Sequence, residues 1–302
     1  MLKQMLKISL LSVLAAISFP ALAGLNIVAC EPEWGALATE LGGDRVKVYN
    51  ATTAQQDPHH IQARPILLAR VRNTDLLVCT GAELEAGWLP ILLRQSSNGN
   101  IQPGKPGYFE AATYVQKLEI PARLDRAEGD VHAAGNPHIH TDPRNIALVA
   151  DALAKRLAQL DPASASYYQL RHRAFTGKWQ TAIQRWEKQA IPLKGMPVVV
   201  QHKAFPYLSR WLGLQEIAVL EPRPGVEPSS GHLGEVLAQI SRQPVKMVLH
   251  AAYQDGRPSE WLAEKAKIQA VALPFTVGGS EQAQDLFSLF DDTLQKLLAA
   301  AK

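Results

Sequence analysis

The chain has 302 residues, of which 47% are hydrophobic and 20% charged, and its formal net charge is +3. A chain of this length can bury a large core and is expected to divide into two domains, because single cores stop growing near this size. The small net charge, without a long basic run, argues against a nucleic-acid partner.

The first 23 residues have the three parts of a secretory signal peptide. A short cationic start, MLKQMLK, precedes the apolar run ISLLSVLAAISF, which is too short for a comfortable membrane span, and ALA at 21–23 fits the pattern cut by signal peptidase. An amphipathic or buried helix is the alternative. We expect cleavage near Ala23, which removes Lys3 and Lys7 and lowers the formal charge from +3 to +1. No cysteine directly follows the apolar run, so we expect an exported, soluble protein without a lipid anchor.

The first half of the mature chain alternates between apolar stretches of strand length and helical patterns. Strands are expected at 25–30, 47–53 and 75–81, and helices at 33–43 and 64–73. This βαβαβ order predicts a parallel sheet with helices on its faces. The Gly-, Pro- and Asn-rich stretch at 96–108 predicts a loop. We assign residues 24–161 to an N-terminal α/β lobe.

Two helices are expected in the middle of the chain. The first carries apolar residues at helical spacing, namely Ile146, Val149, Leu153, Leu157 and Leu160. Asp161 and Pro162 then predict the N-cap and first turn of a second helix. It would cover residues 162–190, a length of about 40 Å at the standard rise. A helix of that length can link two lobes rigidly.

The second half, residues 191–302, repeats the α/β alternation as a C-terminal lobe. Strands are expected at 196–202, 216–222, 245–251 and 269–275, and an amphipathic helix at 280–301. The predicted fold class is therefore α/β, with two doubly wound α/β lobes joined by a long rigid helix. Ligands of open parallel sheets bind beyond the carboxyl ends of the strands, so we expect a site in the cleft between the lobes.

Six histidines fall at the strand ends and helix entries that would line this cleft. They are His59 and His60 after the second strand, His138 and His140 before a helix, and His202 and His250 at the ends of two later strands. Neutral imidazole is the commonest protein ligand for zinc. A single histidine is more often structural, but several on matching edges of two sheets predict a metal site.

Three segments carry motifs in a fixed order, QDPHHIQARP, NPHIHTDPRN and VVVQHKAFPYLSRWLGL. They resemble DPHxYxxxP, DPHxWxDPxN and HxAFxYLxxxYGL of the zinc and manganese solute-binding receptors of bacterial ABC importers, and GVEPSSGHLGEV is similar to that family's EPSxxxL stretch. The resemblance covers essentially the whole mature chain. It implies a periplasmic receptor, which we expect to be monomeric, that delivers a divalent metal to an inner-membrane permease. It also implies that His59, His138 and His202 are metal ligands, with His60 and His140 as the less certain choices beside them.

The fourth ligand departs from the family pattern. A carboxylate from the C-terminal lobe usually completes the family's site, whereas the matching strand here, VKMVLHAAYQ, ends at His250, and LPFTVGGSE has no aspartate at the later position. We therefore expect His250 as the fourth ligand. Four imidazoles favour zinc over manganese, because manganese prefers carboxylate oxygens. Glu33 could supply an oxygen or orient a ligand, or it could be a helix N-terminal acid.

Other polar residues of these motifs have a structural role in the prediction. Asp57, Asn136 and Asp142 are expected to shape turns and caps, because Asp and Asn near proline favour turns. A hydrogen bond from one of them to an imidazole is a second possibility. His132, in the loop before NPHIH, is given no binding role of its own.

The two cysteines, Cys30 and Cys79, end the first and third strands, which are neighbours in a doubly wound sheet of order 2-1-3. In an oxidising periplasm they could form a disulfide. Buried free cysteines are the equal alternative. Thiolate ligation of zinc is less favoured, because both residues belong to one lobe and lack the C-x-x-C spacing.

Two other functions use the same histidines. An exported hydrolase would hold zinc with three histidines and leave an open position for water. The chain has neither an H-E-x-x-H helix nor a G-x-S-x-G turn, so we do not expect an enzyme. A periplasmic metal chaperone would differ from an importer's receptor only in its docking partner.

Overall fold

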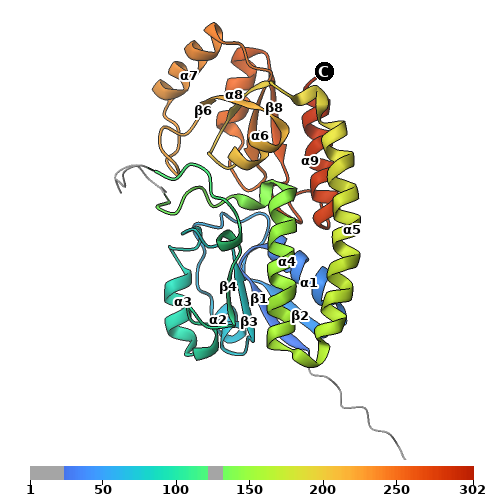
Figure 1. Ribbon diagram of the computed structural model, residues 1–302. Helices are drawn as coiled ribbons and strands as arrows, with labels where there is room; N and C mark the ends of the chain where they lie inside the picture. Colours follow the sequence, from blue (N-terminus) through green and yellow to red (C-terminus); the bar gives the residue numbers. More distant parts are fainter. Residues whose placement is uncertain (1–23, 122–131) are drawn as a thin grey trace, which may run out of the picture.

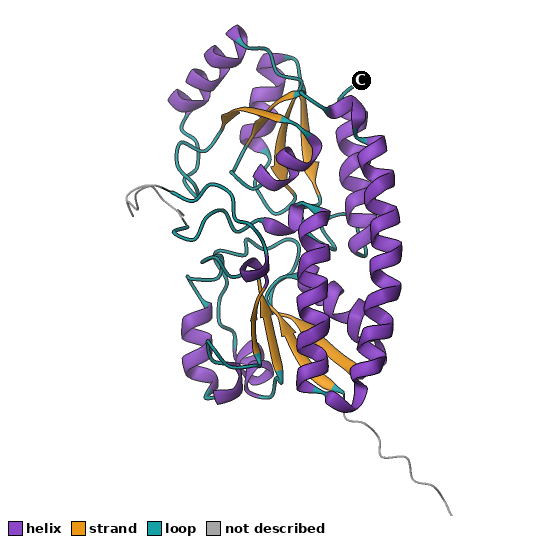
Figure 2. Ribbon diagram, viewed as in Figure 1, coloured by secondary structure: helices purple, strands orange, loops and turns teal. Residues whose placement is uncertain are grey.

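The computed structural model describes residues 24–121 and 132–302. These residues form two lobes, each built around a four-stranded parallel sheet with helices on its faces (Figures 1 and 2). This confirms the predicted fold class. The expected signal peptide, residues 1–23, lies outside the described residues.

The N-terminal sheet has the strand order β2-β1-β3-β4, which includes the expected 2-1-3 arrangement. Its strands are β1 (Leu25–Ala29), β2 (Val46–Asn50), β3 (Leu76–Cys79) and β4 (Tyr108–Glu110), and its helices are α1 (Pro32–Gly42), α2 (Pro65–Arg72) and α3 (Leu89–Ser96). β1 pairs in parallel with both neighbours, so Ala29 lies beside Asn50 and Val78. The carboxyl ends of the three strands therefore meet at one edge of the lobe, below the cleft.

The C-terminal sheet repeats this plan with the order β6-β5-β7-β8. Its strands are β5 (Pro197–Val200), β6 (Gln215–Val219), β7 (Met247–Ala251) and β8 (Gln269–Leu273), and its helices are α6 (Pro206–Leu212), α7 (Ser230–Arg242), α8 (Arg257–Ala266) and α9 (Leu286–Ala300). The last helix begins at Leu286 rather than at 280. Asp285 and Ser288 form a capping box there, and a turn that closes from Gly278 to Ala283 precedes it.

Two long helices, α4 (Pro143–Leu160) and α5 (Ala165–Gln189), run along one side of the molecule (Figure 1). Asp142 caps α4 by accepting a hydrogen bond from the Arg144 amide. The second helix begins at Ala165, because residues 162–164 form a short 3₁₀ turn, and Asp161 accepts the Tyr168 hydroxyl at 2.8 Å. Within the described parts of the chain, no helix is long and apolar enough to cross a membrane.

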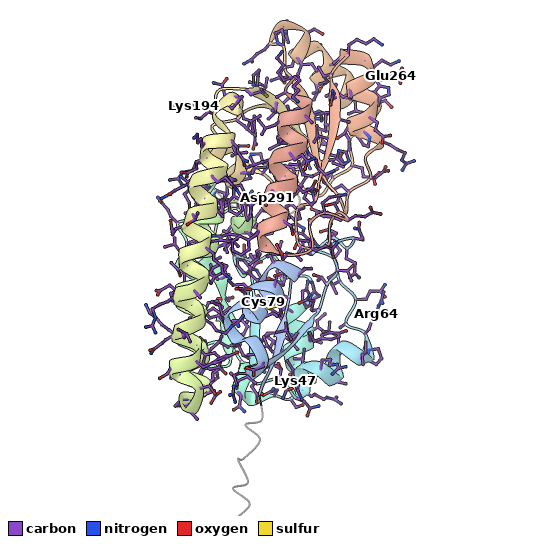
Figure 3. All side chains as sticks on the ribbon, turned by 90° about the vertical axis from the view of Figure 1, so that its right-hand side faces the viewer. Lys47, Arg64, Cys79, Lys194, Glu264 and Asp291 are labelled. Atoms are coloured by element: carbon purple, nitrogen blue, oxygen red, sulfur yellow. A yellow bond between two sulfur atoms is a disulfide. The ribbon has the colours of Figure 1, made fainter. Side chains whose placement is uncertain are left out.

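One hydrophobic core extends through both lobes. It includes Trp34 beside the first sheet, Leu294 of α9 in the second lobe, and Trp179 and Trp186 of α5. The Trp179 indole donates to the Pro143 carbonyl at 2.8 Å. Asp291, labelled in Figure 3 between α9 and α5, accepts from the Trp186 indole at 2.6 Å. α5 therefore packs against both lobes.

Candidate metal centre

Three imidazoles converge between the lobes. His59 lies in the loop after β2, His138 in the segment before α4, and His202 just after β5. One ring nitrogen from each lies within 4.8 Å of the other two, and all three residues are buried. Zinc–nitrogen bonds of about 2.0–2.1 Å place tetrahedral ligand nitrogens about 3.4 Å apart, so a small contraction would close this group around an ion. The lobes share the site, because two rings come from the first and one from the second.

Neighbouring side chains hold the segments that carry these histidines. The Trp88 indole donates to the carbonyl of Pro58, next to His59, at 2.9 Å. The Tyr207 hydroxyl of α6 donates to the Asn136 carbonyl at 2.7 Å, so the C-terminal lobe supports the segment before His138. These contacts reduce the rearrangement that metal binding requires.

Carboxylates contact the far nitrogens of two of the rings. His59 Nδ1 lies 2.7 Å from Asp57 Oδ1, and His202 Nδ1 lies 2.6 Å from Glu221 Oε2. A neutral imidazole that donates its Nδ1 proton to a carboxylate presents Nε2 as a metal ligand. His59 Nε2 is buried and has no hydrogen-bond partner. Burial alone would raise the pKa of Asp57, but its hydrogen bonds to His59 and the charge of that ring leave the pKa below its ordinary value.

His138 is buried on all sides, with 1% of its surface exposed. Asn136 Oδ1 accepts its backbone N–H at 3.0 Å, and its Nδ1 has no hydrogen-bond partner. Burial, followed by the charges that His59 and His202 would carry, holds the pKa of His138 well below its ordinary value. His138 is therefore neutral at neutral pH, so one of its ring nitrogens carries no proton and can bind a cation.

Beside the three-histidine group, His140 and Glu33 of the N-terminal lobe contact Phe275 and Thr276 of the C-terminal lobe. His140 Nδ1 lies 3.2 Å from Glu33 Oε1, too poorly aligned for a hydrogen bond, and its Nε2 lies 3.1 Å from the Phe275 carbonyl oxygen. The Thr276 hydroxyl donates to Glu33 Oε2 at 2.5 Å. The structure does not place either residue in the group, and the exposed His60 also lies outside it.

The structure does not bring His250 into the group either. Side chains alternate along β7, so His250 shares a face with Val248, which packs in the core beneath α7 and α8. A Cβ on Gly256 would come within 3.0 Å of His250 Nε2, which places the ring against the start of α8. Its Nδ1 is buried without a hydrogen-bond partner, and burial lowers the pKa of His250. The role of His250 as fourth ligand stays a prediction.

Two hollows of about 510 and 590 Å³ flank the group. His59, His202 and Glu221 border the first, and His138 and His202 border the second.

His132 also lines the second hollow, and its ring stacks on His59 with centroids 5.4 Å apart. No binding role was predicted for His132 from the sequence. Its one signal was its position, six residues before His138.

The structure joins Cys30 and Cys79 by a disulfide, with Cα atoms 4.7 Å apart. Both residues are fully buried, at the ends of β1 and β3 (Figure 3 labels Cys79). The separation lies within the range that a disulfide allows. That the mature protein carries this bond stays a prediction.

Comparisons with known proteins agree with the sequence motifs. Residues 27–300 match the family described as ZnuA, zinc-uptake complex component A, periplasmic. Among curated relatives, the manganese ABC transporter substrate-binding lipoprotein PsaA of Streptococcus pneumoniae is 23% identical over 279 residues, which is 90% of this chain and 87% of the relative.

Solved structures share the fold. A crystal structure of ZnuA superposes with a TM-score of 0.76 at 23% identity and covers 92% of this chain and 100% of that one. A periplasmic metal binding protein from Candidatus Liberibacter asiaticus gives a TM-score of 0.74 at 17% identity, with the same coverage. At these identities, the superpositions show a common fold.

Proposed function

Because this chain belongs to the family of zinc-uptake complex component A proteins, the metal receptors of ABC importers, we propose that it captures zinc through His59, His138 and His202. The match confirms the receptor expected from the motifs. Relatives of this chain are substrate-binding proteins rather than enzymes, so the hydrolase and chaperone alternatives have no support among them.

The donor set supports zinc over manganese. The group consists of three imidazoles, and the carboxylates of Asp57 and Glu221 contact the far nitrogens instead of the metal position. Imidazole suits zinc, whereas manganese prefers carboxylate oxygen. PsaA of Streptococcus pneumoniae is named as a manganese ABC transporter substrate-binding lipoprotein. The proposal that this chain prefers zinc therefore rests on its own donor set.

Three imidazoles leave a fourth coordination position, for solvent or for another side chain. The sequence predicts His250 there. In this structure, its ring would have to leave the start of α8 and turn toward the cleft. We therefore propose the three histidines as the principal ligands and treat His250 as the candidate that the first experiment tests.

The proposed setting is the periplasm, after removal of residues 1–23 near Ala23. A monomeric, peripheral receptor would take up zinc from the hollows beside His202 and carry it to the permease of an ABC importer in the inner membrane. No further cofactor is required, because zinc is the cargo. The metal would link the two lobes through the ligands that each contributes.

Calorimetry of metal-free mature protein tests the proposal. Zinc should bind at one tight site, manganese much more weakly, and His202→Ala should abolish or severely weaken zinc binding. His60→Ala is the matched control, because its ring is exposed next to His59. Tighter binding of manganese than of zinc would overturn the choice of cargo. Weaker zinc binding by His250→Ala would support a fourth imidazole, and wild-type affinity would leave that position to solvent.

A further inference from the structure

A second cluster of metal-ligating side chains lies inside the N-terminal lobe, at the ends of β1 and β3. Among the described residues, the sulfurs of Cys30 and Cys79 and a carboxylate oxygen of Glu85 lie within 4.8 Å of one another, and all three residues are buried. None of them borders either hollow beside the histidines. We propose that reduction of the disulfide converts this cluster into a second site, for a thiophilic divalent cation such as Cd²⁺ or Zn²⁺.

An unusual turn brings Glu85 to this position. Gly81, Ala82 and Glu83 follow one another with φ values of 75°, 50° and 67°. Residues other than glycine seldom adopt this left-handed conformation, and such strain gathers at functional sites. The turn folds Glu85 back over the end of β3, where its carboxylate accepts the amide protons of Thr80 at 2.7 Å and Gly81 at 3.1 Å. The backbone therefore holds the oxygen donor next to the sulfurs.

Glu31, the residue after Cys30, adds a carboxylate oxygen that could also bind a metal. It is 3% exposed, and its Oε1 has no hydrogen-bond partner, while its Oε2 accepts the Thr80 hydroxyl at 3.0 Å. Burial and then the charge of Glu85 raise the pKa of Glu31 well above its ordinary value, and burial raises that of Glu85 to about 7. Both carboxyls contact Thr80, so a second buried carboxyl lies beside the proposed site.

The proposed switch has two steps, reduction of the disulfide and binding of the cation. A phosphine supplies two electrons to the sulfur–sulfur bond, two protons complete the thiols, and the phosphine takes an oxygen from water to become its oxide. Binding of the cation then forms two metal–sulfur bonds and releases the two thiol protons. Two thiolates and one carboxylate around a divalent cation carry a net charge of −1, which the Thr80 and Gly81 amides would stabilise. Thiolates prefer cations of this class.

The redox state thus decides how many cations the protein holds. In the oxidised protein the sulfurs are bonded to each other and offer no thiolate, so only the three-histidine group binds. In the reduced protein both groups bind. This inference does not depend on zinc being the physiological cargo, because its donors are separate from His59, His138 and His202.

The first measurement is the number of free thiols in the denatured protein as isolated. We expect none, and two would reject the disulfide and with it the redox switch. Protein is then refolded with Cd²⁺, with or without prior reduction by a phosphine. Oxidised protein should hold one equivalent without a thiolate-to-cadmium absorption band, and reduced protein two equivalents with the band. A reduced protein that holds one equivalent and shows no band would overturn the proposal.

Variants separate the two sites. After reduction, the double variant Cys30→Ser, Cys79→Ser should bind Cd²⁺ only at the three-histidine group. Reduced His202→Ala should bind it only at the cysteine cluster. Glu85→Gln should weaken the second site by about tenfold or more while both thiols remain countable. The exposed Glu235→Gln is its control. If Glu85→Gln binds Cd²⁺ like the control, the carboxylate is not a ligand and the site as proposed is wrong, whereas failure of His202→Ala to lose the first equivalent would contradict only the proposed receptor site.

Discussion

Glu221 and Asp57 contact the Nδ1 atoms of His202 and His59, on the side of each ring opposite the proposed metal position. Each carboxylate fixes the ring orientation and increases the basicity of the opposite nitrogen. Glu221 also accepts the Gly225 amide at 2.8 Å, so the loop after β6 is tied to His202. At the scale of single residues, the affinity of the site therefore depends on groups that need not touch the metal.

Replacing Glu221 by glutamine tests this dependence. The variant keeps the shape of the side chain and removes its charge, so zinc affinity should fall by about 10–100-fold. Competition with a fluorescent zinc chelator measures the change. Glu227→Gln is the matched control, because Glu227 lines the same hollow. Equal affinities of the two variants would show that the Glu221 carboxylate does not support His202.

The buried histidines also predict how stability depends on pH. Burial lowers the pKa of His138 and His250 in the folded protein, while the unfolded chain takes up these protons near pH 6.5. The metal-free protein should therefore lose stability as the pH falls below about 6.5 toward the lower folded-state pKa values. Urea unfolding at pH 7.5 and 5.5 measures the loss. His138→Gln should show a smaller loss, and a loss equal to that of wild type would exclude His138 as a cause.

The motifs identified His59, His138 and His202 because their spacing is local in the sequence. The orientation of His250 could not be read in the same way. Both faces of β7 are buried, so VKMVLHA shows no polar alternation that distinguishes the cleft from α8. Glu221 was missed because its contact with His202 depends on how the ends of β5 and β6 lie side by side. For Asp57, the expected turn and the hydrogen bond to an imidazole are both present.

At the scale of elements, α5 carries the packing between the lobes. Its Trp179 is fully buried and contacts Phe175, Trp186 and Phe287 with ring centroids about 5 Å apart. These aromatic rings join α5 to α9. The connecting helix therefore has two roles, as a spacer and as part of the core.

Trp179→Ala should lower the free energy of unfolding by about 3–5 kcal/mol, because it leaves a large cavity and removes the hydrogen bond from the indole to the Pro143 carbonyl. Leu170→Ala is the control on the same helix, where 60% of the side chain is exposed, and it should change stability little. Urea unfolding of the metal-free proteins compares them. A similar small effect of both substitutions would contradict the packing described for α5.

The sequence predicted most elements of the two sheets, and the exceptions have physical causes. β4 has three residues and follows a run of Gly and Pro, so it is too short for a periodic signal. α5 begins at Ala165 because Pro162 starts a separate 3₁₀ turn. In the last helix, the amphipathic pattern was extended upstream past Asp285, although D-x-x-S at 285–288 is a capping signal.

At the scale of the whole molecule, the lobes are joined by one continuous core and by the contact of Thr276 with Glu33. Such a molecule should close only slightly around its cargo. Spin labels at Arg64→Cys and Glu264→Cys would report the motion, since these exposed positions lie in different lobes on the side away from α5 (Figure 3).

Pulsed electron paramagnetic resonance should show that zinc changes the distance between these labels by less than about 2 Å. The same labels on His202→Ala provide the control for effects of zinc outside the site. A larger change in the wild-type background alone would show that α5 acts as a hinge rather than as a rigid link.

The stiffness of α5 also bears on how long a captured ion stays. In a receptor that hardly rearranges, the free-energy cost of reorganising the protein on binding is small. The lobes then seldom separate by thermal motion, so the ion dissociates slowly. The rate at which cargo leaves is then governed by the ATP-driven partner in the membrane. On this view, release of the ion depends on the importer and not on spontaneous opening of the receptor.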